Sequence, residues 1–533
     1  MKSVFLNLFF GEECMYEPLN ILTIVDYLSK KGHEVFIFNE ELSDNTICYK
    51  YIDEISPDII FVSAVFQKNK TRIITFLNDF SKRYNIPIFV GGHDVTLRYS
   101  QYFKECRCIS GIILGPGEVT INELLNCIQQ GENWKNIEGI AYRNEGNEII
   151  CNKFSKGNRI TYNYWIDRRI LLQNLSKYGT KIIREAAMLS SRGCCWNCSF
   201  CSVNKYNKLL EMRKYEIRSG EDIAKEMKSV QNLTGLKVFS FVDDLFLLHG
   251  KKGKERLREL YEFIKKYKIS IEAIKICTRV DSIDRENIDL LKKLNVKQIY
   301  LGIESFYKYD LERYNKEITS EQIIEALDNL QSYGYKASID SEYKIIPGSI
   351  IFNPWTTIDG LKYNLGLFKR YNFPPKRFVR KLFIYEDTEI LNWLKQNNYI
   401  ISEDLSYNMR PEVEVAYKMC KYVIREVSIV REKIREIEKI LTVFNLIIPE
   451  NLKLFRKEAD EFIYSCFEII IKDNLEQPVM EIIINQMLEE FNTKAREMEY
   501  IMESRKNYID NLISTTVNMD IDIFKKRVLS NEL

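Results

Sequence analysis

Short apolar runs alternate with amphipathic helical patterns over the first 130 residues. The runs VFLNLFF, EVFIFNE, DIIFVSA, IPIFVGG and GIILGPG each precede a helical pattern. Unalternated apolar runs of this length are typical of strands that are buried on both faces. The pattern therefore predicts an α/β domain over residues 1–135, built on a doubly wound parallel sheet.

The alternation resumes beyond a polar connector, which we place at residues 136–180. The connector contains a predicted hairpin, IAYRNEGNEIICNKF. Further strands are predicted at VFSFVDDLF, IEAIKICTR, KQIYLGIES, KASIDSEYKIIP and RFVRKLFIY, with helices such as SGEDIAKEMKSVQ between them. Six β/α units over residues 181–400 predict a partial (β/α)6 barrel of the TIM type, whose chemistry lies at the carboxyl ends of its strands.

The alternation stops near residue 403, and helical patterns fill the rest of the chain. One apolar stripe recurs at spacings of 4, 3, 4, 3 and 4, which predicts an amphipathic helix of about 30 residues. Its members are Val423, Val427, Val430, Ile434, Ile437 and Leu441. Residues 401–533 are therefore predicted to form an all-helical C-terminal domain, either over the barrel mouth or as a docking element.

Composition narrows the class of protein. The chain has 533 residues, enough for several cores, and lacks the run of about 18 apolar residues that a membrane helix requires. Thirteen cysteines without a recognisable secretion signal favour a cytoplasmic protein whose thiols are free or bind metal.

Charge is unevenly distributed along the chain. Residues 131–400 carry 46 basic and 34 acidic side chains, a balance of +12, against −4 before them and −6 after them. Such a basic middle suits an anionic substrate or cofactor, and equally an ordinary solvated surface. No Lys/Arg block is interleaved with aromatic residues, so no nucleic-acid partner is expected.

Three cysteines, Cys194, Cys198 and Cys201, stand in the run SSRGCCWNCSFC. Thiolates hold iron–sulfur clusters, usually four to a 4Fe–4S unit, so three on one short loop leave one iron open. A structural zinc site would need four ligands, and no second Cys/His pair follows at a suitable spacing. The neighbouring Cys195 creates a second register, CxxCxxC, which stays open on spacing alone.

The spacing CxxxCxxC, with Arg192-Gly193 before it and Phe200 before its last cysteine, resembles the radical S-adenosylmethionine (SAM) superfamily. The resemblance favours Cys194 over Cys195 and implies a 4Fe–4S cluster whose open iron binds SAM and whose electron cleaves it. An electron donor of the flavodoxin or ferredoxin type is also implied. By the same resemblance, Phe200, Asp243, Arg279, Glu304 and Ser305 bind SAM. The alternative for the charged residues is a structural ion pair on the barrel rim.

The first domain resembles the cobalamin-binding domain of cobalamin-dependent radical SAM enzymes, the class B methyltransferases among them. GGHDVTL and GPGE carry the likeness, and glycines at strand ends let backbone amides approach a ligand. The implied cobalamin contacts are Ser63, Gly91, Gly92, Gly115, Gly117 and Glu118. The Asp-x-His-x-x-Gly motif is absent, so no imidazole on cobalt is expected; a domain that has lost the cofactor is the alternative.

The resemblance implies methylation of an unactivated carbon in a specialised small molecule or peptide, with no catalytic residue identified beyond the cluster ligands. A rearrangement or cyclisation enzyme of the same family is the first alternative. A regulator that senses through its cluster, and an RNA-modifying radical enzyme, are the others. The RNA-modifying enzyme would need a second cluster-binding cysteine set in the first domain, and the cysteines there form no clear set.

Overall fold

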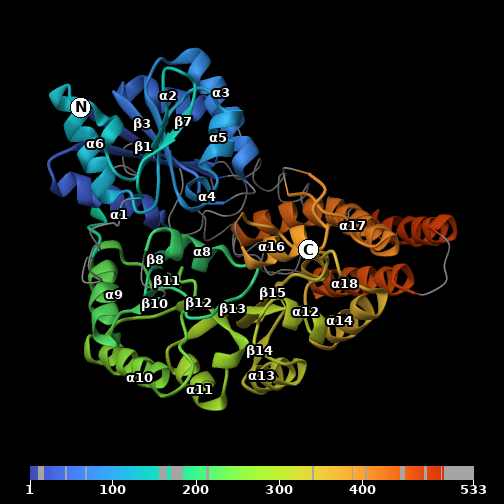
Figure 1. Cartoon of the computed structure of the whole chain (residues 1–533). Coiled ribbons are helices and arrows are strands. Elements are labelled where there is room, and N and C mark those ends of the chain that lie inside the picture. The colour runs from blue at the N-terminus through green and yellow to red at the C-terminus, as the bar shows by residue number, and fades with distance from the viewer. Residues whose placement is uncertain are drawn as a thin grey trace, which may run out of the picture.

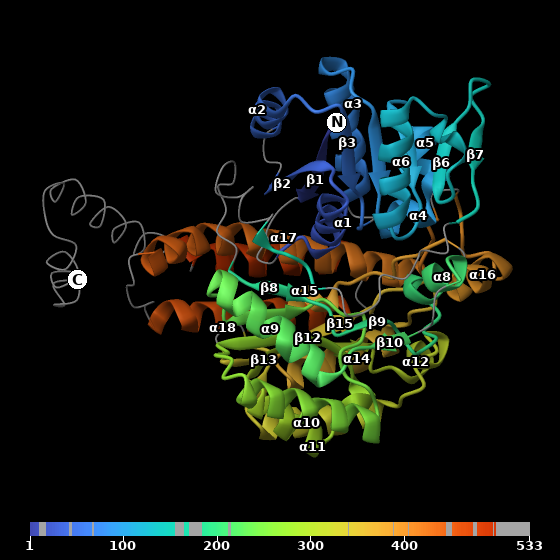
Figure 2. The same ribbon diagram turned by 90° about the vertical axis from the view of Figure 1, so that its left-hand side faces the viewer.

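Two α/β units lie one above the other, and a helical unit packs beside the second (Figure 1; Figure 2). The computed structural model describes residues 1–9, 17–41, 45–66, 69–154, 165–169, 184–211, 215–338, 341–386, 388–402, 405–443, 450–472, 477–493 and 495–496. Among the helices of these residues, none combines the length and the apolar character that crossing a membrane requires.

The first unit is built on a seven-stranded sheet in the order β2-β1-β3-β4-β5-β6-β7. Its strands are β1 (Lys2–Phe9), β2 (Glu34–Glu41), β3 (Ile59–Ser63), β4 (Ile88–Gly91), β5 (Ile109–Ile113), β6 (Ile140–Arg143) and β7 (Ile149–Cys151). The five predicted apolar runs form β1 to β5, which pair in parallel. The predicted hairpin forms β6 and β7, which continue this sheet as antiparallel strands on β5.

Helices cover both faces of the first sheet, as the unalternated strands predict. Helices α1 (Leu19–Lys30) and α6 (Glu118–Gln130) bury their apolar side chains on one face. The other face is covered by α2 (Thr46–Ile55), α3 (Lys70–Arg83), α4 (His93–Leu97) and α5 (Tyr99–Glu105). A 3₁₀ turn, Trp134–Asn136, follows α6. The strand order 2-1-3-4-5 is a doubly wound topology, whose ligands bind outside the carboxyl ends of the strands.

The second unit is built on a six-stranded parallel sheet in the order β14-β15-β13-β12-β11-β8. Its strands are β8 (Ala186–Met188), β11 (Val238–Phe241), β12 (Ala273–Arg279), β13 (Val296–Glu304), β14 (Tyr335–Lys336) and β15 (Tyr343–Ser349). The sheet is open, because β8 and β14 are its two edges. The run KASIDSEYKIIP, predicted as one strand, forms the two short strands β14 and β15.

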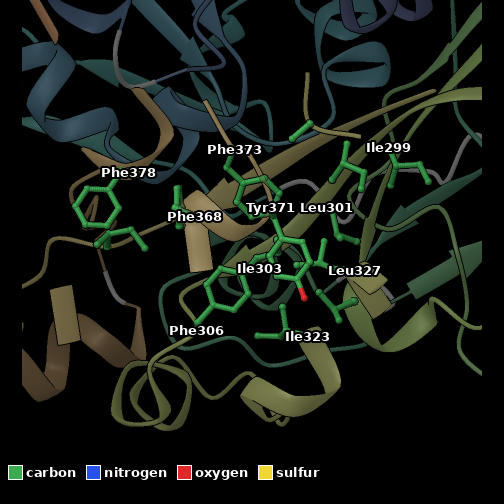
Figure 3. Packing of buried hydrophobic residues seen from close by; sticks show 14 of the residues in the cluster. Ile299, Leu301, Ile303, Phe306, Ile323, Leu327, Phe368, Tyr371, Phe373 and Phe378 are labelled. Carbon is green, nitrogen blue, oxygen red and sulfur yellow. The ribbon is translucent and has the colours of Figure 1, made fainter. Parts of the chain in front are cut away.

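Helices lie against the outer face of the second sheet. They are α9 (Gly220–Thr234), α10 (Lys251–Lys266), α11 (Arg285–Lys293), α13 (Ser320–Ser332) and α14 (Ile358–Arg370). Side-chain caps begin several of them, such as Ser219 at α9 and Thr357 at α14. In Figure 3, Ile299, Leu301 and Ile303 of β13 belong to the same apolar cluster as Ile323, Leu327 and Phe368 of the helices. This cluster is the main core of the unit.

One predicted strand is wrong. The run RFVRKLFIY begins inside a helical turn, α15 (Pro375–Phe378), and its later residues make only a single bridge, from Lys381 to Phe352. Pro375 stands at the first helical position, where the fixed φ of proline and its missing N–H favour a helix start. The short helices α12 (Lys308–Arg313) and α16 (Glu389–Gln396) complete this part.

The C-terminal unit contains α17 (Pro411–Val443), α18 (Glu450–Ile470) and a helical stretch over 477–493. Val423, Val427 and Val430 of the predicted stripe are buried. The side chains of its other three members lie outside the described residues. Helix α18 docks on the second unit: the rings of Phe467 and Phe378 lie 5.6 Å apart, and the Tyr464 hydroxyl donates to the Phe373 carbonyl.

A buried ion network joins the first unit to the free edge of the second sheet. The Arg168 guanidinium bonds both oxygens of Glu17, at 3.0 and 2.8 Å from Nε, and reaches Glu226 at 3.2 Å. Glu17 accepts the backbone N–H of Ala187, and Arg168 donates to the carbonyl of Ala187. Ala187 lies in β8, so these two side chains satisfy an edge strand that has no further strand beside it.

Candidate active site

The loop of residues 194–201 lies between the short strand β9 (Ser191–Gly193) and helix α8 (Ser202–Leu209). Strand β9 pairs only with β10 (Tyr215–Ile217), in an antiparallel ribbon outside the main sheet. Gly193 has φ +75°, in the left-handed region that favours glycine, and its N–H bonds the Asp244 carboxylate at the end of β11. The loop therefore starts at the carboxyl edge of the second sheet.

Backbone contacts fix the middle of the loop. Ser199 donates its N–H to the carbonyl of Tyr314 at 3.0 Å and its hydroxyl to the carbonyl of Arg313 at 2.7 Å. Phe200 lies edge to face on Tyr314, with ring centroids 5.3 Å apart. The structure thus shows Phe200 as a packing residue that holds the loop on the segment after α12; its expected contact with SAM stays a prediction.

The three cysteines of the pattern lie close enough for their charges to interact. Burial raises the pKa of Cys194 to about 11 and that of Cys201 to about 12, and each feels the charge of Cys198. All three are half-buried, whereas Cys195 is exposed. This difference supports Cys194 as the first member of the set.

Three thiols on one loop fit the donor set of a 4Fe–4S cluster, which thiolates hold. Among the described residues, no group of three or more His, Cys, Asp or Glu side chains could hold one metal ion. Because thiolates are the ligands, the raised pKa values mean that binding would release protons.

Alternation along the strands decides which side chains face the inner side of the second sheet. In β12, Ile274 and Ile276 join the core against the helices, so Cys277 and Arg279 point to the opposite, inner side. The pairing register sets Gly302 of β13 beside Arg279, and Gly348 of β15 beside Gly302. Near their carboxyl ends, β13 and β15 therefore both have a glycine at the same register position, and neither carries a side chain there. This side-chain-free position lies next to the cysteine loop.

Arg279 lies against the cysteine loop. Its Nη1 is 3.1 Å from the Cys198 sulfur, and its guanidinium lies 4.1 Å from the centre of the Trp196 ring. It also bonds Asp281, at 3.1–3.3 Å. The structure thus places Arg279 where the sequence interpretation needs a cation, although Asp281 occupies part of its donor set.

The two aspartates after β11 have different surroundings. Asp243 Oδ1 accepts hydrogen bonds from Ser190 and Ser191, so this carboxylate holds the start of β9 in place; its Oδ2 has no partner among the described residues. Asp244 feels no cation strongly, and burial followed by repulsion from Asp243 raises its pKa to about 6. Cys201 and Cys277 both feel its charge, so Asp244 is a second acidic side chain near the cysteines.

Glu304 and Ser305 face different surroundings. Glu304 has φ +67° and sits at an irregularity of the β13–β15 pairing. The ammonium of Lys316, which is 1% exposed, lies 3.2 Å from Glu304 Oε1 and 3.1 Å from the Gly302 carbonyl. Ser305 is buried, and its hydroxyl bonds Asp310 at 2.7 Å, away from this pair. Lys316 was missed from the sequence, where a single lysine 12 residues beyond the strand gives no signal.

Arg279, Glu304 and Asp244 therefore lie around the side-chain-free ends of β13 and β15. A Cβ on Gly302 would stand 3.1 Å from Glu304 Oε1, so the glycine keeps that carboxylate close to the strand. A guanidinium suits the carboxylate of an amino-acid ligand, and carboxylates suit its ammonium and ribose hydroxyls. The residues present fit SAM.

On the first sheet, Ser63 and Gly91 are register partners at the ends of β3 and β4. The Ser63 hydroxyl accepts a hydrogen bond from Asn20 at 2.8 Å. Gly92 has φ +127°, and a Cβ there would lie 2.7 Å from the Ala64 carbonyl oxygen. The glycine pair thus lets two strand ends approach closely, at the edge where a doubly wound sheet binds its ligand.

The GPGE turn is occupied by other parts of the protein. A Cβ on Gly115 would lie 2.8 Å from a Leu210 methyl group, and its N–H bonds Thr96 Oγ1 at 3.0 Å. Gly117 packs near Ile24 and Ile121, and Glu118, 8% exposed, begins α6. The structure therefore brings Ser63, Gly91 and Gly92 together at the open edge, and packs Gly115, Gly117 and Glu118 against apolar side chains and the end of α8.

His93 connects the two units directly. Its Nε2 lies 2.9 Å from the hydroxyl of Ser202, the residue after Cys201, and its ring stacks on Tyr206 at 4.4 Å. Burial lowers the pKa of His93 to about 4, against a smaller opposing effect of Asp94. The edge of the first sheet thus lies on the helix that follows the cysteine loop.

Comparison with known proteins identifies both units. The model of the Radical SAM superfamily matches residues 188–348, and that of the B12 binding domain matches residues 14–125. An uncharacterized methyltransferase of Pyrococcus horikoshii is 27% identical over 60% of this chain and 68% of its own length. An anaerobic magnesium-protoporphyrin IX monomethyl ester cyclase of Rubrivivax gelatinosus is 25% identical over 67% of this chain and 69% of its own.

Among solved structures, the fold is similar to that of the cobalamin-dependent SAM radical enzyme OxsB with aqua-cobalamin and SAM bound. The superposition has a TM-score of 0.68 at 18% identity and covers 99% of this chain and 83% of that one. The likeness therefore extends over both sheets and the C-terminal helices.

Proposed function

Because the chain is a radical SAM enzyme that carries a B12-binding domain, we propose that it methylates an unactivated carbon of a specialised small-molecule or peptide substrate. One observation carries the proposal: His93 at the carboxyl edge of the B12-binding sheet bonds Ser202, the residue after Cys201. The edge proposed to hold cobalamin and the loop proposed to hold the cluster therefore adjoin. When bound, the cluster and SAM supply a carbon radical by one-electron reduction, and cobalamin supplies a methyl carrier.

The residues of this chain bind and orient. Cys194, Cys198 and Cys201 would hold three irons, and Arg279 with Glu304 would hold the carboxylate and the ribose or ammonium of SAM. Lys316 compensates the charge of Glu304 and fixes its position, since it bonds both that carboxylate and the Gly302 carbonyl.

On the first unit, Ser63, Gly91 and Gly92 would meet the corrin or its tail, because they form the open edge of the sheet. Gly115 contributes to the packing of the two units, because Leu210 lies against it, and the contacts of Gly115, Gly117 and Glu118 with cobalamin stay predictions. We propose that a flavodoxin- or ferredoxin-type protein delivers the electron.

Cyclisation without methyl transfer is the second candidate. It is favoured by the similarity to the anaerobic cyclase, whose alignment covers a larger share of this chain than that of the methyltransferase. The products distinguish the two. Methyl transfer releases S-adenosylhomocysteine beside 5′-deoxyadenosine, whereas cyclisation releases no S-adenosylhomocysteine.

The test is anaerobic reconstitution with iron, sulfide and hydroxocobalamin, followed by reduction with dithionite in the presence of SAM. We expect bound corrin absorbance and formation of both nucleoside products, and expect both products to disappear in Cys198→Ala. Unchanged turnover in Cys198→Ala would refute the cluster assignment. A colourless protein that still cleaves SAM would refute the cobalamin part alone.

A further inference from the structure

Three of the cations on the inner side of the second sheet are paired with carboxylates. Toward the amino ends of the strands, Lys275 of β12 is paired with Glu185. At the carboxyl ends, Lys316 is paired with Glu304, and Arg279 with Asp281. Two other cations on this side, Lys344 and Arg377, have no carboxylate partner among the described residues, since no ion pair involves either.

The position of Lys344 follows from the strand. Its neighbour Tyr343 packs on the outer side, where the Lys292 ammonium lies over its ring and Tyr335 lies against its edge. Successive residues of a strand point to opposite faces, so Lys344 belongs to the inner side. The pairing register places it beside Gln298 of β13.

Arg377, from α15, is held at the same face by Tyr300. Its Nη1 lies 3.2 Å from the Tyr300 hydroxyl, and its guanidinium lies 5.5 Å from the centre of that ring. Tyr300 is 38% exposed although it stands in the middle of a central strand, because no helix covers this side of it. Among the described residues, the Arg377 guanidinium bonds only the Tyr300 hydroxyl, so an oriented guanidinium stands beside an accessible aromatic ring.

Tyr300, which Arg377 contacts, lies close to the proposed SAM position. Tyr300 and Gly302 are two residues apart on one strand and one face, a separation of about 6.6 Å. Tyr300 is also the register partner of Ile346, which stands two residues after Lys344. A molecule lying on Tyr300 would thus reach Lys344 with one part and the side-chain-free strand ends with another.

We infer that the substrate carries an anionic group, a phosphate or a carboxylate, which Arg377 and Lys344 bind on the inner face of the second sheet. The inference rests on the proposed function, because it places the anion beside the reaction that function assigns. A guanidinium recognises the planar edge of a carboxylate or the oxygens of a phosphate with two parallel hydrogen bonds. The flat face of Tyr300 suits an aromatic or otherwise planar body attached to that anion.

The experiment measures binding of three probes to the reconstituted holoenzyme by ligand-observed NMR titration. Phenyl phosphate and benzoate carry the anion, and benzyl alcohol is the neutral probe. We expect at least one anion to bind about tenfold more tightly than benzyl alcohol, and Arg377→Gln to lose about that factor. The tighter of the two anions identifies the group.

The matched control is Arg370→Gln, which removes an exposed arginine that pairs with Asp328 on the outer side. It should bind all three probes as the wild type does. Lys344→Gln provides a second variant should Arg377→Gln fail to fold, and we expect it to weaken anion binding severalfold.

Equal binding of anions and benzyl alcohol by the wild type would overturn the inference, as would unaltered anion binding in both variants. Cleavage of SAM is measured on the same wild-type preparation. Anion selectivity without SAM cleavage would refute the proposed function but support the anion-binding site. SAM cleavage without selectivity would refute only the anion-binding site.

Discussion

The two parallel sheets of this protein differ in what covers them. Strand β3 of the first sheet buries four consecutive residues, Ile59 to Val62, because helices pack on both of its faces. Strand β12 of the second sheet instead alternates, with Ile274 and Ile276 in the core and Lys275 and Cys277 on the other side. Helices line only the outer face of that sheet. Side chains on the inner face of the second sheet are therefore available to a ligand. On the first sheet, only residues at the carboxyl edge are.

Contacts at the edges of the two sheets join the two units. The edge of the first sheet rests on α8 through His93 and Gly115, and the free edge of the second is satisfied by Glu17 and Arg168. These contacts between the units involve the segments that precede or follow the cysteine loop. Variants at these contacts test how far the two sheets act as one site.

The largest expected effect concerns the cysteines of the loop between β9 and α8, which belong to the second unit. Cys194→Ala should lose most of the bound iron and reduce SAM cleavage more than about hundredfold, since even outer partners of a metal site are worth 10–100-fold. Cys195→Ala is the matched control, because Cys195 is exposed, and it should keep both. Iron and sulfide analysis with quantification of 5′-deoxyadenosine provides the measurement. Loss of iron and of SAM cleavage in Cys195→Ala, but not in Cys194→Ala, would establish the CxxCxxC register.

The next effect concerns the ion network that joins the units. Arg168→Met leaves Glu17 buried without a cation among the described residues, whereas Glu226 keeps Arg218, and we expect a loss of about 3–5 kcal/mol in the free energy of unfolding. Burial already raises the pKa of Glu17 despite the nearby guanidinium. The measurement is the thermal midpoint of the holoenzyme.

Arg169→Met is the control for that variant. Arg169 is the adjacent residue, it is mostly exposed, and its partner is Asp167, so its loss should change stability little. Adding Glu17→Gln to Arg168→Met should recover part of the stability, because Glu17 then carries no unpaired buried charge and Glu226 keeps Arg218. An Arg168→Met protein as stable as the wild type would show that the network does not hold the units together.

The contrast between the sheets was partly visible in the sequence. The apolar runs located β1 to β5, and IEAIKICTR was predicted as a strand, but the polar face of that strand was not predicted. The strand predicted at RFVRKLFIY is wrong because its apolar residues pack around a helical turn that Pro375 begins. Local pattern does not show whether an apolar run pairs with a neighbour or only fills a core.

The site was harder to predict, because its contacts join residues far apart in the chain. Arg168 and Glu17 are separated by 151 residues, and no local pattern pairs them. Leu210 covers Gly115, a packing contact that the sequence did not show, and the contact of this glycine with cobalamin stays a prediction. Spacing did single out the cysteines, since their chemistry requires them on one loop, and their role as cluster ligands stays a prediction. Partners of single side chains, such as Lys316 for Glu304, emerge only in three dimensions.

A smaller effect on stability is expected when the pH is lowered, because His93 lies at the contact between the two units. Burial lowers the pKa of His93 from 6.5 to about 4, so the unfolded chain binds a proton there that the folded chain does not. Stability should therefore fall as the pH drops from 6.5 to 4, by at most about 3 kcal/mol, because the ring is only half-buried.

His93→Phe keeps the stacking on Tyr206 and removes the titration, so it should show a shallower decline over that range. Ser202→Ala, which removes the hydrogen-bond partner but keeps the imidazole, should keep the wild-type slope. Thermal unfolding at pH 5.0 and 7.0 compares them. Identical slopes for the wild type and His93→Phe would show that His93 does not sense pH at this contact.

The smallest effect separates backbone strain from the contact between the sheets. Gly115 and Gly131 both have positive φ, +82° and +70°, but a Cβ on Gly131 would meet nothing within 4 Å. Alanine at Gly131 should therefore cost about 1–2 kcal/mol of unfolding free energy, from the backbone alone. Alanine at Gly115 should cost about 1 kcal/mol more, because it presses on Leu210. Adding Leu210→Ala should remove that difference but not the shared strain. Equal costs at the two glycines, measured by chemical unfolding, would mean that Leu210 moves aside at no cost in free energy. The first sheet would then not be closely packed on the cysteine-bearing unit at this turn.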